Sequence, residues 1–188
     1  MSINERNPDD RRVVRTRQAI IEAVTRLIFS KGITSVSMAS VADAANVGRS
    51  TLYEHFKNKD ELLAASIAPL FDALAHGCVA IDDDPEMLSL VTHFWGGRTF
   101  APFMLQGRTG QVIGKIMIES FERALVKRPA STKRLPATQC RLAAIYMARG
   151  TIGILLDWLT GRVTGSPTEI AAMLRTFGNA NWQFNRGD

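Results

Sequence analysis

The chain has 188 residues, of which 46% are hydrophobic and 22% are charged. This balance excludes an intrinsically disordered chain, and the length is sufficient for one large or two small domains with a buried core. The formal net charge of +5 and the pI of about 9.6 favour a polyanionic partner, but the basic residues are spread along the chain, so charge alone is weak evidence for nucleic-acid binding.

Targeting and redox signals predict a cytoplasmic protein. The N-terminal residues carry no apolar segment of the signal-peptide type. The two cysteines, Cys78 and Cys140, do not suggest a disulfide scaffold, and we expect free thiols. The longest apolar region, residues 142–159, is interrupted by Arg149 and Asp157, which favours a buried bundle helix over a membrane span.

The first predicted element is a helix from Val13 to Lys31, ended by Gly32. We expect residues 1–12 to form a disordered tail. Arg15 and Arg17 continue the basic character of this tail into the helix, where they could lie along DNA phosphates or enter a minor groove. A solvated helix end explains the same arginines equally well.

The next stretch predicts two short helices joined by a tight turn. Ser37 is suited to cap the first of them. The tripeptide Asn-Val-Gly at residues 46–48 then turns the chain, because Asn and Gly tolerate left-handed backbone angles. A second helix begins at Arg49, and its Leu52 and Phe56 lie four residues apart on one apolar face.

The outward face of the second helix carries Arg49, Ser50, Tyr53 and His55. A cation and hydrogen-bonding groups on a short helix with few acidic residues suit contact with phosphates and base edges. This is the layout of a DNA-reading helix-turn-helix. A helical hairpin inside an ordinary bundle is the alternative.

The same stretch resembles the tetracycline-repressor (TetR) family at about ten positions of defined character. The motif resemblance covers about residues 13–63. Two positions depart from the family pattern, since Asn46 stands where the family usually has Gly and Gly48 where it often has Ser. Both residues still permit the turn and the cap, but a hydroxyl that could touch phosphate is lost. The matching residues are Val41, Ala42, Ala45, Val47, Thr51, Leu52, Tyr53, His55, Phe56, Lys59 and Leu62.

The resemblance implies an all-α protein that binds a palindromic operator as a homodimer. A three-helix DNA-binding domain is expected at residues 1–58, followed by a larger helical domain for effector binding and dimerisation at residues 59–188. Arg49 is the predicted base-reading residue, and Lys59, at the start of the next helix, is a predicted phosphate clamp. The predicted DNA contacts are Arg15, Arg17, Ser37, Gly48, Arg49, Ser50, Thr51, Tyr53, His55 and Lys59.

A long helix from Lys59 to about Ala80 is predicted to link the two domains. The aromatic-rich region that follows the next turn is broken by Gly and Pro, which is typical of a cavity wall, although plain core packing explains it equally well. Arg149 either pairs with Glu119 or Glu122 or meets an anionic ligand. The predicted wall favours a largely apolar ligand and consists of Phe71, His93, Phe94, Trp95, Phe100, Phe103, Met104, Met117, Phe121, Tyr146 and Arg149.

Two C-terminal helices predict a dimer interface. The first, from Pro136 to about Leu159, is apolar on more than one face and must be covered on both sides. The second opens with a capping box from Ser166 to Glu169. Two such helices from each of two subunits would form a four-helix interface, and filling of a monomer core is the alternative. The predicted interface residues are Ile152, Leu155, Leu156, Trp158, Ile170, Leu174 and Phe177.

The sequence therefore predicts a dimeric transcriptional regulator, and the resemblance implies a repressor that a small molecule releases from DNA. One alternative is a DNA-binding protein of the same fold without an inducer, acting architecturally or through a protein partner. An all-α enzyme or carrier is a third possibility, but the sequence offers no catalytic constellation, metal-ligand spacing or phosphate-cradling loop to support it. No cofactor and no metal are predicted.

Overall fold

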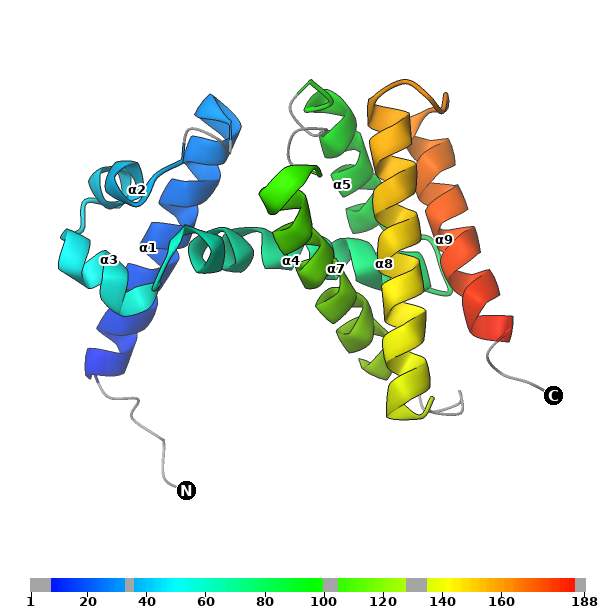
Figure 1. Ribbon diagram of the computed structural model, residues 1–188, viewed down its shortest axis with the longest axis horizontal. Helices are drawn as coiled ribbons and strands as arrows, with labels where there is room; N and C mark the ends of the chain where they lie inside the picture. Colours follow the sequence, from blue (N-terminus) through cyan, green and yellow to red (C-terminus); the bar gives the residue numbers. More distant parts are fainter. Residues whose placement is uncertain (1–7, 33–35, 100–104, 128–134, 185–188) are drawn as a thin grey trace. The chain divides into compact units, whose positions relative to one another are not determined.

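The computed structural model describes residues 8–32, 36–99, 105–127 and 135–184, and all regular secondary structure in these ranges is helical (Figure 1). The chain divides into two compact units, Met1–Ile67 and Ala68–Asp188, with the division inside helix α4 (Lys59–Val79). The predicted all-α architecture is confirmed. The functional boundary predicted between residues 58 and 59 lies at the start of the same helix and stays a prediction.

The first unit begins with α1 (Pro8–Lys31). The prediction of a disordered tail up to residue 12 was wrong for residues 8–12, which are the first turns of this helix. Asp10 is compatible with this helix start, because an acidic residue near a helix N-terminus is favourable. Residues 1–7 lie outside the described part of the chain.

The turn between α2 (Met38–Ala45) and α3 (Arg49–His55) forms as the sequence predicts. Ser37 caps α2, since its hydroxyl accepts the Ser40 N–H at 3.1 Å while the Ser40 hydroxyl accepts the Ser37 N–H at 3.0 Å. Asn46 ends the helix in the left-handed conformation, with φ of 53°. Gly48 is the N-cap of α3 but offers no side-chain hydrogen bond.

A second capping box starts α4. The Asn58 side-chain oxygen accepts the Glu61 N–H at 2.9 Å, and the Glu61 carboxylate accepts the Lys57 N–H at 2.8 Å. The backbone N–H groups of Lys57 and Glu61, which have no partner within a helix, are therefore both hydrogen-bonded. This arrangement fixes Lys59 as the first residue of the helix.

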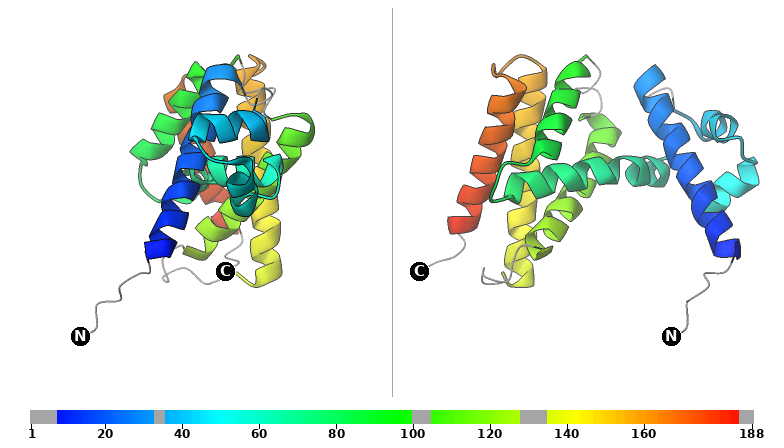
Figure 2. Two further views of the ribbon diagram at one scale, coloured as in Figure 1. Left: turned by 90° about the vertical axis from the view of Figure 1, so that its left-hand side faces the viewer. Right: turned by 180° about the vertical axis from the view of Figure 1, so that it is seen from behind.

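The second unit contains the C-terminal half of α4 and the helices α5 (Pro85–Gly96), α7 (Gly107–Lys127), α8 (Ala137–Leu159) and α9 (Pro167–Phe184). Figures 1 and 2 show α5, α8 and α9 running side by side, with α4 crossing them. Asp84 caps α5 by accepting the Glu86 N–H at 2.9 Å. The predicted Ser166–Glu169 capping box is confirmed, since each side chain accepts the other residue's N–H.

A close approach fastens α9 to the end of α4. A Cβ at Gly178 would collide with the Cys78 carbonyl oxygen, so only glycine allows the two backbones to come this near. Next to it the Asn179 side chain donates to the Ala80 carbonyl at 2.9 Å, and Arg175 pairs with Asp83. The last turn of α4 is therefore held by α9 through backbone contact, a hydrogen bond and an ion pair.

Aromatic stacking closes the other end of this unit. The rings of Trp95 and Trp158 stack with centroids 4.7 Å apart, and the fully buried Trp158 donates its indole N–H to the Gly165 carbonyl at 2.8 Å. The indole donor is thereby satisfied within an apolar core, as a buried tryptophan requires.

Helices α4 and α8 are long and apolar enough to pass a composition test for membrane spans. However, 56% of the apolar window of α4 and 39% of that of α8 are buried inside the chain. Burial of this kind is a property of core helices in globular domains, which also pass the test.

The turn residue Asn46 generates a prediction for stability. Replacing Asn46 with Ala should lower the free energy of unfolding by about 1 kcal/mol, because Ala tolerates positive φ less well than Asn, whereas Asn46→Gly should be close to neutral. Urea denaturation of the two variants measures this. Glu54→Ala, in the exposed face of α3, is the matched control. Equal stability of Asn46→Ala and Asn46→Gly would contradict the strain argument.

Candidate nucleic-acid interface and the hollow of the second unit

Helix α3 has one buried apolar face and one exposed polar face, as a helix that contacts DNA requires. Leu52 and Phe56 are fully buried, and they fix the helix against the core of the first unit. Arg49 and Ser50 are exposed, and Tyr53 keeps 52% of its surface accessible. Because the apolar face is committed to the core, the guanidinium, hydroxyl and phenol groups are presented to solvent as one polar surface.

Arg17 has a structural role that the sequence did not indicate. Its guanidinium donates to the His55 carbonyl at 3.2 Å and lies over the Phe56 ring, 4.3 Å from the centroid. A cation at a helix C-terminus is favourable, and stacking on an aromatic face adds to it. Arg17 therefore holds α1 to the end of α3, and its predicted phosphate contact remains a prediction.

Three of the other predicted DNA contacts lie at helix starts. The Ser37 hydroxyl is engaged in capping α2, Gly48 begins α3 with an exposed backbone, and Lys59 begins α4 as a half-buried residue. Thr51 and His55 are half-buried along α3. Helix starts expose backbone N–H donors that suit phosphate oxygens, so these positions are compatible with the predicted contacts.

Arg15 belongs to a basic cluster on folded helix. Together with Arg11, Arg12 and Thr16 it lines a shallow hollow of about 440 Å³ on the first turns of α1. The sequence predicted this basic run, but it placed Arg11 and Arg12 in a disordered tail and only Arg15 in a helix. On a helix the three guanidinium groups are held in fixed order, which reduces the entropy lost when they meet phosphate.

Two contacts that position helices of the first unit were not predicted from the sequence. Arg26 donates to the Ala44 carbonyl at 3.4 Å, which fastens α1 to the C-terminal end of α2. The Asn58–Glu61 capping box orients the start of α4. The box was readable as Asn-x-x-Glu before an apolar run, whereas the partner of Arg26 depends on how α1 and α2 cross.

In the second unit, the described residues of the predicted aromatic wall differ in exposure. Phe71 and Phe94 stack with centroids 6.4 Å apart, Met117 and Phe121 are fully buried, and His93 is exposed. A cavity wall and plain core packing both stay predictions for these residues. Trp95 stacks on Trp158 as described above, and Phe100, Phe103 and Met104 lie outside the described residues.

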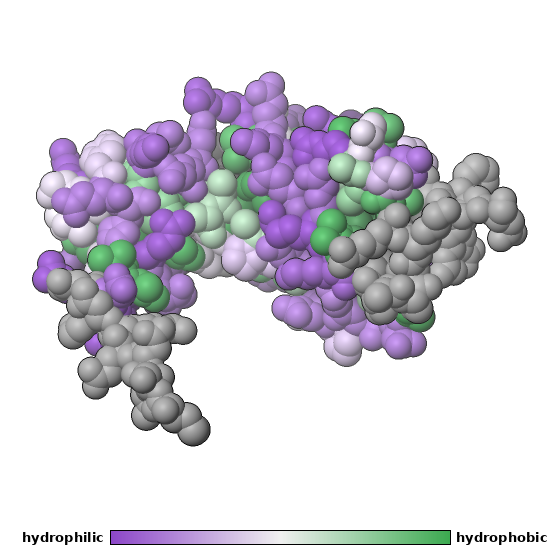
Figure 3. Space-filling model, turned by 90° about the horizontal axis from the view of Figure 1, so that it is seen from below, coloured by the Kyte–Doolittle hydropathy of each residue, from purple (hydrophilic) through white to green (hydrophobic). Residues whose placement is uncertain are grey.

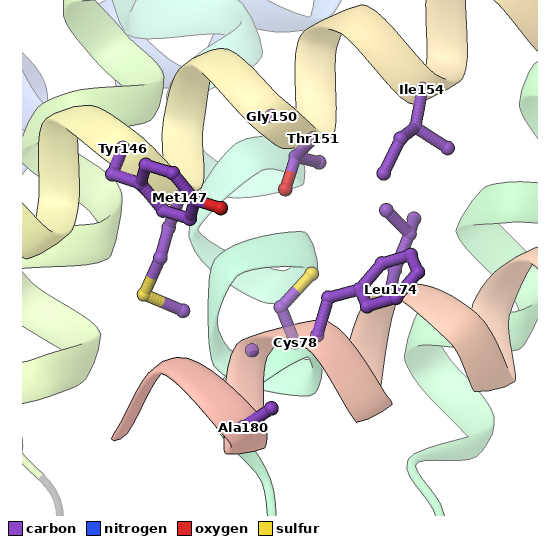
Figure 4. Close-up of a pocket in the computed structure, with 10 residues that line it drawn as sticks. Cys78, Tyr146, Met147, Gly150, Thr151, Ile154, Leu174 and Ala180 are labelled. Atoms are coloured by element: carbon purple, nitrogen blue, oxygen red, sulfur yellow. The ribbon is translucent and has the colours of Figure 1, made fainter. Parts of the chain in front are cut away.

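A different set of residues surrounds a hollow of about 570 Å³ between α8 and α9, with the end of α4 at its floor (Figure 4). Only Tyr146 belongs also to the predicted wall. The thiol of Cys78 and the hydroxyl of Thr151 both lie at the floor of this hollow. The lining consists of Cys78, Tyr146, Met147, Gly150, Thr151, Ile154, Leu174, Phe177, Gly178 and Ala180.

The predicted ion pair of Arg149 is not present among the described residues. Glu122 pairs with Arg141 at 2.7 Å, and Glu119 lies 3.9 Å from Lys115. The guanidinium of Arg149 instead lies across α7 at Gly114, where a Cβ would stand 3.2 Å from its Nη1. The glycine provides the room that this crossing needs.

Four of the seven predicted interface residues are core residues of the chain itself. Leu155, Trp158, Ile170 and Leu174 are at most 5% exposed, so they cannot meet a second copy in this conformation. A helix that is apolar nearly all round does not reveal which face its own chain covers, and this is why the prediction was wrong for them. Phe177 is 47% exposed, and Ile152 and Leu156 are half-buried.

These features define the class of protein. A three-helix unit with two short helices at a tight turn, a polar outward face and basic helix starts is a DNA-binding helix-turn-helix unit. It is joined through α4 to a larger helical unit.

Comparison with known proteins gives the family. Residues 20–66 match the family model described as bacterial regulatory proteins of the tetR family. The transcriptional regulator BetI of Burkholderia lata is 29% identical over 174 residues, which cover 85% of this chain and 88% of BetI. The first unit therefore carries a TetR-family DNA-binding domain, and the chain as a whole is similar to transcriptional regulators. These relatives are DNA-binding regulators and not enzymes.

Solved structures share the fold. A TetR transcriptional regulator from Rhodococcus sp. RHA1 aligns with a TM-score of 0.57 and 20% identity, covering 89% of this chain and 96% of that one. The multidrug binding protein EbrR, crystallised with imidazole, aligns with a TM-score of 0.50 and 21% identity, covering 85% and 93% of the two chains.

The buried Cys78 makes stability depend on pH in a defined direction. Burial raises the pKa of its thiol from the ordinary 9.0 to about 12. Because the unfolded thiol loses its proton first, the free energy of unfolding should fall between pH 9 and pH 12, by up to about 1.4 kcal/mol per pH unit from this group. Cys78→Ala should show a shallower fall in denaturant titrations across this range.

Val79→Ala is the matched control, because it removes a buried apolar side chain of the same helix turn that does not titrate. It should lower stability and leave the pH slope as in the wild type. A Cys78→Ala protein with the wild-type slope above pH 9 would show that the thiol is not desolvated.

Proposed function

We propose that this protein is a repressor that binds an inverted-repeat operator as a homodimer and is released by a small, largely apolar molecule. The observation that carries the proposal is the polar outward face of α3 above a fully buried Leu52 and Phe56. Two such faces on a two-fold dimer would meet half-sites about 34 to 36 Å apart, or a multiple of this distance. A regulator of this type acts in the cytoplasm, where the DNA is.

Within this proposal, Arg49 reads a base. It is the first residue of α3, it is exposed, and among the described residues no carboxylate is bonded to it. A guanidinium at the start of a reading helix reaches the O6 and N7 acceptors of guanine in the major groove. Ser50, Tyr53 and His55 then hold phosphates on either side, and Lys59 adds a cation at the start of α4.

The proposed dimer face lies on the exposed sides of α8 and α9. Leu142 and Tyr146 on α8 are 61% and 65% exposed, and Met173 and Phe177 on α9 are 44% and 47% exposed. Large exposed apolar side chains on two helices are typical of an interface. On the face shown in Figure 3, by contrast, hydrophilic residues dominate and hydrophobic ones come through in small separate patches.

Two glycines support the same face. Gly150 and Gly153 on α8 are exposed, and apart from the adjacent backbone of α8 no atom of the described residues lies within 4 Å of the position that a Cβ would take on either. Each costs about 1 kcal/mol in a helix interior, and no packing among the described residues offsets this. Close approach of a helix from a second copy would supply the missing compensation.

Release by a small molecule is supported by the hollow in the second unit and by the fold. EbrR, which shares the fold, is a multidrug binding protein. A hollow of about 570 Å³ lies within the size range of small-molecule sites. For a hundredfold loss of operator affinity, the ligand must favour the DNA-incompetent state by about 2.7 kcal/mol.

Two single substitutions should distinguish a residue that reads a base from a residue that binds phosphate. Arg49→Ala should cost about 1–3 kcal/mol of operator affinity and relax preference at one base pair, because the base contact is lost. Lys59→Ala should weaken operator and random DNA alike and lower the salt slope by about one per subunit. Fluorescence anisotropy on both DNAs over a range of salt concentrations measures this.

Lys115→Ala, on the exposed side of α7, serves as the control and should change neither quantity. If the Arg49 variant kept full discrimination between operator and random DNA, its assignment as the base-reading residue would fail.

The dimer face yields a second prediction. Phe177→Glu should raise the dimer dissociation constant by at least about a hundredfold, because association would bury an unpaired carboxylate. Ile81→Glu, at an apolar residue outside α8 and α9 that is 72% exposed against 47% for Phe177, should leave association unchanged. Sedimentation of both variants over a range of concentrations decides, and equal behaviour of the two would remove α9 from the interface.

A further inference from the structure

We infer that Glu54, at the centre of the outward face of α3, restricts the DNA that this protein accepts by requiring the N4 amino group of a cytosine in the major groove. The inference deepens the proposed function and rests on it, because it adds a second base-specifying residue to Arg49. The two residues act in opposite ways. Arg49 adds affinity for one base, whereas the carboxylate of Glu54 penalises every site that lacks its partner.

Glu54 lies on the side of α3 opposite to the buried face. It stands two residues after Leu52 and two before Phe56, and both of these side chains are fully buried. Residues two apart in an α-helix point about 200° apart, so Glu54 points away from both. Glu54 and Ser50, which stands four residues earlier, are exposed and form the line of the helix farthest from the core. A helix that enters the major groove by its polar face brings this line deepest into the groove.

The other polar residues of α3 lie on the two flanks of this line. Arg49 and Tyr53, four residues apart, lie on one flank and are exposed. Thr51 and His55, also four residues apart, lie on the other flank and are half-buried. Side chains on the flanks lie nearer to the phosphates, and Arg49 reaches a base from there because its side chain is long and it begins the helix. The side chain of Glu54 is directed at the base edges.

The carboxylate of Glu54 has no partner within the described part of the chain, where no hydrogen bond or ion pair engages it. It is the only acidic residue of α3. An ionised carboxylate carries acceptors and no donor, and the phosphates of DNA repel it. Glu54 therefore lowers affinity for every sequence unless a base supplies a donor.

Cytosine is the base that supplies this donor best. Guanine and thymine present acceptors in the major groove, and adenine presents its N6 amino group beside the N7 acceptor, which repels a carboxylate. Cytosine presents the N4 amino group alone, and Glu accepts from it. Over any other base the carboxylate loses its hydration without gaining a donor, so that site is disfavoured.

Selection from a duplex library with a randomised central segment tests which base Glu54 requires. The full-length wild type should select a motif with one cytosine per half-site that Glu54→Ala no longer requires. Glu54→Gln should admit adenine at the same position, because an amide pairs with N6 and N7 together. Glu22→Ala is the matched control, since it removes an exposed carboxylate of α1 in the same unit, and it should select the wild-type motif.

Fluorescence anisotropy on defined duplexes tests the donor itself. N4-methylation of the selected cytosine keeps the base pair and removes the hydrogen that points into the major groove. Wild-type affinity should then fall by at least about fivefold, and the affinity of Glu54→Ala should not change. On random DNA Glu54→Ala should bind about threefold to fivefold more tightly than Glu22→Ala, because a carboxylate close to the phosphates is gone. This gain is opposite in sign to the loss expected for Arg49→Ala.

Three results would overturn the inference. They are an unchanged motif in Glu54→Ala, an equal effect of N4-methylation on the wild type and on Glu54→Ala, and random-DNA binding of Glu54→Ala no tighter than that of Glu22→Ala. Circular dichroism checks that the variants are folded, which the exposed positions of both carboxylates favour. A wild type that selects no motif would count against the proposed function itself. A selected motif that is indifferent to Glu54 would leave that function standing and remove this inference alone.

Discussion

The burial of Leu52 and Phe56 is the constraint on which the DNA-binding unit depends. Helix α3 has only seven residues and would not be stable alone, so its position comes from these two side chains. Arg17 reinforces it by stacking on Phe56 and bonding the end of the helix. Because that face is fixed against the core, Arg49, Ser50 and Tyr53 lie on the solvent-exposed face of α3. A short helix held in this way can present these side chains to DNA.

Helix α4 is also fixed by specific contacts, one at its start and one at its end. A capping box at Asn58 and Glu61 defines its start, and the contact of Gly178 with the Cys78 carbonyl defines its end. Pro69 lies between these two points, and a proline inside a helix removes one backbone hydrogen bond and favours a kink. The chain divides into its two units beside this residue, after Ile67.

The proposed dimer face and the hollow have residues in common. Tyr146 and Phe177 are exposed apolar residues of α8 and α9, and both also line the hollow. A second copy docked on this face would narrow the opening above Cys78 and Thr151. Ligand binding and subunit packing would then be coupled through the same two side chains, which is a physical basis for a differential affinity between two states of the dimer.

The helices from α2 to α4, the turn between α2 and α3, and the outward polar face of α3 follow from residue order alone. Ser37, Asn46 and Gly48 act locally, through capping and backbone angle, so their effect can be predicted from neighbouring residues. The packing of the helices sets which apolar face of α8 is covered by its own chain, which carboxylates pair with Arg141 and Lys115, and where a hollow remains. These depend on how helices distant in sequence cross, and helical periodicity gives the faces of a helix without naming their partners.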